Sequence, residues 1–132
     1  MVVELKRPGK TKVVVSDTNY ASVAEDLMGP YACGAGKKLT TTKLRSIYAL
    51  ITNVYTQVNT PEEFHQHFSD IQYLKVRMAY EAGRETVVRD FLEVTGLLHL
   101  VDAIASFEQF KLYCRYAEAL VAFFKYFGRE DK

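Results

Sequence analysis

The sequence predicts an all-α protein, a compact bundle of about five to six helices with a short N-terminal arm. Apolar residues recur at spacings of three and four over most of the chain, and capping residues precede these periodic segments. Apolar and aromatic residues make up 48% of the 132 residues, enough to build a core. No internal repeat or low-complexity tract interrupts the pattern. We therefore predict one domain over residues 1–132, with a basic arm at 1–16 and a core bundle at 37–127.

The N-terminal segment mixes lysines with valines and leaves two interpretations open. The valine run 13–15 favours a short edge strand, whereas the lysines and Pro8-Gly9 around it favour a mobile arm. Residues 19–28 have the pattern of a short helix, which Gly29-Pro30 is expected to stop. A flexible link over 31–36 is expected to follow.

The first strongly periodic helix is predicted to begin in the threonine run 40–42 and to reach about Val58. A second start signal follows, because Thr60 can cap, Pro61 suits the first turn and Glu63 can close a capping box. This second long helix is predicted to run to about Ala82.

The helix predicted over 60–82 carries two apolar stripes on nearly opposite sides. One stripe contains Phe64, Phe68, Ile71, Met78 and Ala82, and the other contains Tyr73, Val76 and Tyr80. Because such a helix needs cover on both sides, we expect a self-association surface, with a homodimer as the form in isolation.

Two shorter apolar-periodic segments, 86–94 and 97–104, are divided at Gly96. Ser106 is then expected to cap a last long helix. Its apolar arc spreads over more than half the circumference, which is typical of the central helix of a bundle.

The sequence contains no recognisable catalytic or metal-binding constellation. His65 and His67 are two residues apart, so on a helix their side chains point about 200° from each other and cannot coordinate the same metal ion. The run 34–38 lacks the spacing of a phosphate loop, and Cys33 and Cys114 are expected to be reduced thiols. We predict no enzyme activity, catalytic residue, metal site or cofactor.

Neither a membrane span nor a signal peptide is evident, because no stretch of about 18 apolar residues occurs. We expect the protein to stay in the cytoplasm.

Positive charge is concentrated although the net charge is only +1. The stretch 37–57 holds four basic residues and no acid, and further basic residues lie on the later helices. These groups predict a basic surface, while solvated surface residues remain the alternative. Lys75 is unusual because helical geometry places it between Ile71 and Met78 on the apolar side. It either snorkels or marks where a ligand or neighbouring subunit arrives.

Three blocks of the sequence, 39–45, 73–85 and 113–126, together resemble the small subunit of the type III-A (Csm) CRISPR effector complex. They read LTTTKLR, YLKVRMAYEAGRE and YCRYAEALVAFFKY, and they occur in the family's order and spacing within 39–127. The resemblance implies a helical bundle without catalytic activity that stacks in several copies inside the complex, in antiviral defence. The implied partners are guide (CRISPR) RNA, target RNA, other Csm subunits and neighbouring copies of the chain.

The basic residues and the resemblance together predict a sequence-independent RNA-contacting set. Its members are Lys37, Lys38, Lys43, Arg45, Lys75, Arg77, Arg84, Arg115 and Lys125. The alternative is a protein–protein spacer whose basic residues pair with acidic faces of neighbouring subunits.

Overall fold

The computed structural model describes residues 2–3 and 13–128. Within that part, the chain forms seven α-helices, two 3₁₀ helices and two short strands. The α-helices are α1 (Tyr20–Cys33), α2 (Thr41–Tyr55), α3 (Pro61–Gln66), α4 (Phe68–Arg84), α5 (Thr86–Thr95), α6 (Leu97–Leu100) and α7 (Phe107–Gly128). The 3₁₀ helices are η1 (Ala35–Lys38) and η2 (Val101–Ala103). The predicted all-α class is confirmed.

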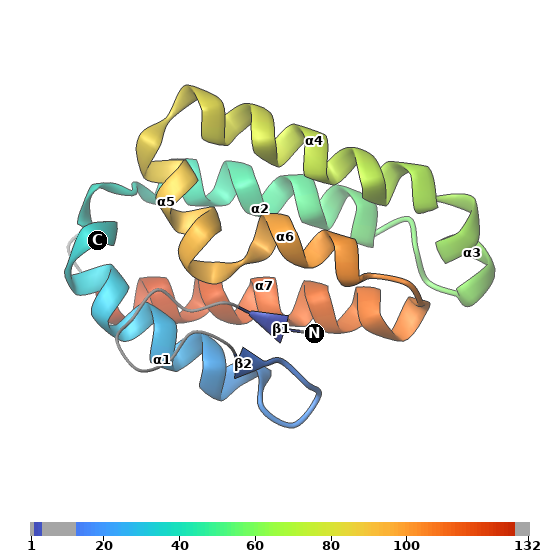
Figure 1. The fold of residues 1–132 in the computed structure, drawn as a ribbon, viewed down its shortest axis with the longest axis horizontal. Helices are drawn as coiled ribbons and strands as arrows, with labels where there is room; N and C mark the ends of the chain where they lie inside the picture. The colour runs from blue at the N-terminus through green and yellow to red at the C-terminus, as the bar shows by residue number, and fades with distance from the viewer. Residues whose placement is uncertain (1, 4–12, 129–132) are drawn as a thin grey trace.

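Helix α7 lies at the centre of the bundle, between α1 and α2 (Figure 1). Helix α4 packs on the far side of α2, and α5 and α6 close the bundle against α4. Phe110, Tyr113 and Tyr116 of α7 are among the largest fully buried side chains. The expectation that the last long helix is the central one is confirmed.

The junction between α5 and α6 is held by two tyrosines of α7. Gly96 adopts a left-handed conformation with φ 75°, which separates the two helices where the sequence predicted a division. The Tyr116 hydroxyl donates to the Thr95 carbonyl at 2.7 Å, and the Tyr113 hydroxyl donates to the Leu97 carbonyl at 2.7 Å. Carbonyls on both sides of Gly96 therefore find their partners on the central helix.

Three predicted N-caps are confirmed by their hydrogen bonds. The hydroxyls of Thr40, Thr60 and Ser106 accept from the backbone N–H three residues later, at 3.1, 3.1 and 3.2 Å. The Glu63 carboxylate also accepts a hydrogen bond at 2.7 Å, but its donor is the N–H of Asn59, one residue before the cap, so the contact is a variant of the predicted capping box.

The predicted helix stop at Gly29-Pro30 is wrong, because α1 continues through both residues to Cys33. Burial explains the continuation: Met28, Tyr31 and Ala32 extend the face that packs on α7. A Cβ on Gly29 would lie 3.6 Å from the Phe127 ring, an ordinary packing distance, so close packing does not require a glycine at this position. The packing of α1 on α7 outweighs the backbone hydrogen bond that Pro30 removes.

The expected flexible link at 31–36 is also wrong. Tyr31 is buried with its ring centroid 5.9 Å from that of Phe91 and 6.1 Å from that of Phe124. The 3₁₀ helix η1 follows, and a Cβ on Gly36 would come within 2.4 Å of the Tyr31 ring. A glycine is therefore required at this position by close packing.

The helix predicted over 60–82 is two helices, α3 and α4, which break at His67. Phe64 of α3 is buried, with its ring centroid 6.4 Å from that of Phe110 on α7, while α4 lies along α2. His67 has non-helical backbone angles, and its Nδ1 lies 2.9 Å from Asp70 Oδ2. A single straight helix could not place Phe64 against α7 and also lie along α2, so the chain turns at His67 between α3 and α4.

The two predicted stripes of this segment have different environments. Phe64, Ile71 and Met78 are buried, but Tyr73 and Tyr80 are 56% and 63% exposed. Val76, between them, is 56% exposed. All three side chains of this second stripe are therefore more than half exposed.

The valine run at 13–15 forms an edge strand, one of the two interpretations of the N-terminal arm. β1 (Val2–Val3) pairs antiparallel with β2 (Val13–Val14), with Val3 opposite Val13. The rest of the predicted arm, at residues 1 and 4–12, lies outside the described residues.

Replacing Tyr116 with phenylalanine is expected to reduce the free energy of unfolding by about 1–2 kcal/mol. The variant keeps the ring but leaves the buried Thr95 carbonyl without its donor. Urea unfolding followed by circular dichroism measures the difference. Tyr126→Phe is the matched control, because Tyr126 is on the same helix but 68% exposed. Equal stability of the two variants would contradict the role given to the Tyr116 hydroxyl.

The Cys114 thiol is expected to be unreactive in the folded protein. Burial raises its pKa to about 12, so at pH 8 only about one molecule in ten thousand carries the thiolate. Cys33 is exposed and serves as the internal control. Titration with a disulfide reagent should detect one fast thiol in native protein and two after denaturation. Two fast thiols in the native protein would show that Cys114 is accessible.

Candidate nucleic-acid interface

Three of the predicted basic residues lie on the exposed sides of the adjacent helices α2 and α7. Arg115 and Lys125 are exposed on α7, where ten positions turn them about 80° from each other, and Arg45 is exposed on α2. The three have no ion pair with a carboxylate of the described residues. Their charges are therefore available for contacts outside the chain.

The boundary between α2 and α7 is a shallow hollow lined in part by Tyr48, Thr52, Arg115 and Glu118. Partial burial and then the Glu118 carboxylate raise the pKa of Tyr48, so this phenol remains a neutral donor. Arg45 continues the line of Tyr48 and Thr52 along α2. The surface thus combines three cations with one carboxylate, and we name Arg45, Arg115 and Lys125 the α2–α7 basic surface.

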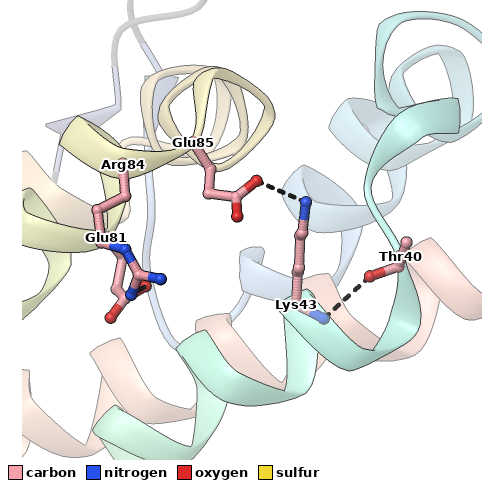
Figure 2. Close-up of polar contacts among 5 residues, drawn as sticks. All are labelled: Thr40, Lys43, Glu81, Arg84 and Glu85. Atoms are coloured by element: carbon pink, nitrogen blue, oxygen red, sulfur yellow. Dashed lines mark hydrogen bonds and ion pairs between the residues drawn. The ribbon is translucent and has the colours of Figure 1, made fainter.

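Three other predicted residues are engaged within the chain. Lys43, in the first turn of α2, forms an ion pair with Glu85 at the junction of α4 and α5 (Figure 2). Arg84 lies 3.4 Å from Glu81 and packs over the Tyr80 ring, with its guanidinium carbon 5.7 Å from the ring centroid. The Lys43–Glu85 and Arg84–Glu81 pairs both lie at the C-terminal end of α4, as Figure 2 shows.

Lys75 is the third residue engaged in an ion pair within the chain. Its position distinguishes between the two interpretations left open by the sequence, a snorkelling lysine and a contact with a ligand or neighbouring subunit. Its side chain is 37% exposed and its ammonium lies 2.8 Å from the Asp102 carboxylate of η2. It therefore snorkels along the apolar side of α4 to a partner from the same chain. Arg77 projects from the other side of α4, toward α2. The structure does not bring Lys75 and Arg77 together.

The remaining predicted residues, Lys37 and Lys38, are exposed on η1. They precede α2 in the chain. The nine predicted residues thus divide into exposed cations near α2 and α7, cations engaged in ion pairs, and Arg77 in a groove.

The groove that contains Arg77 runs between α2 and α4 and includes residues that the sequence analysis did not select. Asn53 of α2 and Gln57, just after the end of that helix, face Tyr73 and Arg77 of α4 across it. Asn53 lies in the last turn of α2 and Gln57 in the turn that follows the helix, so no helical spacing in the sequence identifies them as a pair. Which helix they face depends on the tertiary packing.

Catalytic and metal chemistry find no support in the described residues. No group of three or more histidine, cysteine or carboxylate side chains there has the arrangement of a metal site. His67 is occupied with Asp70, and the buried Cys114 thiol has a raised pKa that disfavours the thiolate. Within 2–3 and 13–128, none of the helices has the length and apolar character needed to cross a membrane.

Rigid helices that carry arginine and lysine suit contacts with phosphate groups. Guanidinium groups bind phosphate oxygens in a bidentate manner, and such contacts depend on position and not on base identity. The α2–α7 basic surface and Arg77 are therefore the parts of the described chain best suited to a nucleic-acid backbone.

Comparisons with known proteins agree on one family. The family model described as Csm2 Type III-A matches residues 21–130. The CRISPR system Cms protein Csm2 of Streptococcus thermophilus is 33% identical over 126 residues, covering 89% of this chain and 98% of the relative. The protein of that name from Enterococcus italicus is 41% identical over 99 residues, covering 70% of this chain and 71% of the relative. That of Mycobacterium tuberculosis is 34% identical over 123 residues, covering 90% and 98%.

The family match begins within α1, so it includes a helix that the resemblance at 39–127 left out. It also spans α7 and both sides of the groove between α2 and α4. The extent of the match and the relatives above lead to one assignment: the chain belongs to the Csm2 family, the small subunits of type III-A CRISPR complexes.

Proposed function

We propose that this chain is a non-catalytic subunit that contacts the guide–target RNA duplex through phosphate and sugar groups. The observation that carries the proposal is the α2–α7 basic surface, three exposed cations on two packed helices without an ion-pair partner in the described chain. Several copies stack side by side in a cytoplasmic antiviral complex, with guide RNA, target RNA and other Csm subunits as partners.

Sequence-independent contact fits the division of labour in RNA-guided recognition. Base pairing between guide and target reads the sequence, so a lining subunit needs only backbone contacts. A few cations per copy give weak binding, and stacked copies strengthen it through effective concentration. The net charge of +1 is compatible with this, because most of the surface is left for contacts between subunits.

The ion pairs within the chain allow the nine predicted residues to be ranked by their expected contribution to RNA binding. Arg45, Arg77, Arg115, Lys125, Lys37 and Lys38 are free of ion pairs to described residues, so they meet RNA at no cost to internal contacts. Lys43, Lys75 and Arg84 must share or release a carboxylate partner first. We therefore assign the larger contribution to the first group.

The triple variant Arg45→Glu, Arg115→Glu, Lys125→Glu is expected to weaken duplex RNA binding by at least tenfold at low salt. Each lost phosphate contact should also reduce the slope of log affinity against log salt by about one. Affinity measurements over a salt series, on the protein and on the assembled complex, test both expectations.

Arg89→Glu is the control, because Arg89 is an exposed arginine of α5 outside the predicted set. If the triple variant matches this control in RNA binding and in complex activity, the α2–α7 surface is not an RNA contact. If it instead blocks assembly while residual complex keeps normal target affinity, the spacer function is correct.

The exposed stripe of α4 supports self-association, the second part of the proposal. Val76 and Tyr80 lie uncovered on the outermost helix of the bundle (Figure 1). An antiparallel pair of α4 helices would place these apolar side chains against each other. It would also bring Asp70, near the start of one helix, toward Arg84 at the end of its partner.

The double variant Val76→Glu, Tyr80→Glu is expected to shift the dissociation constant of a homodimer upward by at least tenfold, because it places like charges in the contact. Light scattering and sedimentation over a concentration series measure this. Gln72→Glu provides the control, since Gln72 is exposed on the same helix outside the stripe. An unaltered protein that remains monomeric at high concentration would rule out the homodimer.

A further inference from the structure

The groove between α2 and α4 has an apolar floor and a polar rim. Leu74, buried on α4, and Leu50 and Val54, half-buried on α2, form the floor. Asn53 and Gln57 line the α2 side. Tyr73, Arg77 and Asp70 line the α4 side. The groove therefore offers an aromatic face, two amides, a cation and a carboxylate to one occupant.

We propose that this groove binds a single unpaired nucleotide of RNA, with its base stacked on Tyr73 and its phosphate at Arg77. The proposal rests on the RNA-contacting function proposed above and adds a second type of contact to it. The α2–α7 basic surface meets the backbone of a duplex, whereas the groove takes a base that is outside a duplex stack.

Tyr73 is the centre of the argument because of its exposure. Its side chain is 56% exposed, and its hydroxyl has no hydrogen bond with the described residues. Stacking a base on an exposed aromatic ring removes apolar surface from water and is tolerant of base identity. A tyrosine at the edge of an apolar floor is thus suited to hold any of the four bases.

The rim supplies the groups that the rest of a nucleotide requires. Arg77 has no ion pair within the described chain and is free to bind a phosphate. The amides of Asn53 and Gln57 each donate and accept, and neither side chain is hydrogen-bonded to a described residue. Such amides match the edges of different bases without strong preference.

Asp70 limits what the groove can accept. It lies seven residues before Arg77, about 10 Å along the helix, and its carboxylate disfavours a second phosphate at that end. A ribose hydroxyl can donate to it instead. One phosphate at one end and a hydroxyl donor at the other describe one nucleotide better than a continuous backbone.

A second copy of the chain is the competing occupant, and the arrangement of α4 argues against it. Tyr73 belongs both to the exposed stripe and to the groove lining, whereas Val76 and Tyr80, the apolar centre of the proposed self-association, are not part of the groove lining. The groove is concave with mixed polar groups, whereas Val76 and Tyr80 form a projecting apolar stripe. Tyr73 and Tyr80 therefore separate the two occupants experimentally.

The test uses the intact protein and a short single-stranded RNA that contains 2-aminopurine, whose fluorescence falls when the base stacks on tyrosine. Tyr73→Ala is expected to abolish the quenching and to weaken binding by about tenfold. Tyr73→Phe should keep both, because the ring remains. An abasic nucleotide in place of 2-aminopurine should make unaltered protein and Tyr73→Ala bind equally.

Tyr80→Ala is the matched control, an exposed tyrosine on the same helix outside the groove. If it reduces quenching as much as Tyr73→Ala does, the effect comes from self-association and the proposal is overturned. Absence of quenching by the unaltered protein at any concentration also overturns it. Duplex binding that survives reversal of Arg45, Arg115 and Lys125 counts against the proposed function, whereas absence of quenching by the unaltered protein, with duplex binding normal, counts against the groove.

Discussion

The hydrogen bonds from Tyr113 and Tyr116 to the backbone beside Gly96 are the constraint on which the bundle depends. A helix break inside a core exposes carbonyl groups that must be satisfied. Here both donors come from one helix, so the position of the α5–α6 corner is set relative to α7. Helix α4 packs on that corner and α2 packs on both α4 and α7, so the corner helps to place these helices relative to one another.

The same constraint explains where the cations of the surface lie. Because α7 contacts α1 on one side and α2 on another, its exposed residues are confined to one face, and Arg115 and Lys125 both lie within that face. Arg45 reaches the same region from α2. Side chains on helices that are already packed lose little backbone freedom when a ligand binds, so weak contacts of this kind remain useful.

The sequence predicted helix boundaries correctly where a single capping residue or glycine determines them. Thr40, Thr60 and Ser106 cap as expected, and Gly96 divides two helices. The prediction was wrong at Gly29-Pro30 and at His67, where burial of Tyr31 and Phe64 determines the path of the chain. The partners of Lys43 and Lys75 are 42 and 27 residues away in sequence, so no local pattern distinguishes these lysines from the free ones. The groove could not be predicted from local patterns either, because its two sides come from segments that are distant in sequence.

The contact between α1 and α7 is the most extensive between any two helices, and these are the first and last helices of the described chain. Contacts of such long sequence separation form late, because the intervening chain must first be brought together. During synthesis on the ribosome, the apolar face of α1 therefore waits for the segment that covers it. Until α7 emerges, Val23, Leu27 and Met28 remain open to chaperones or to premature association.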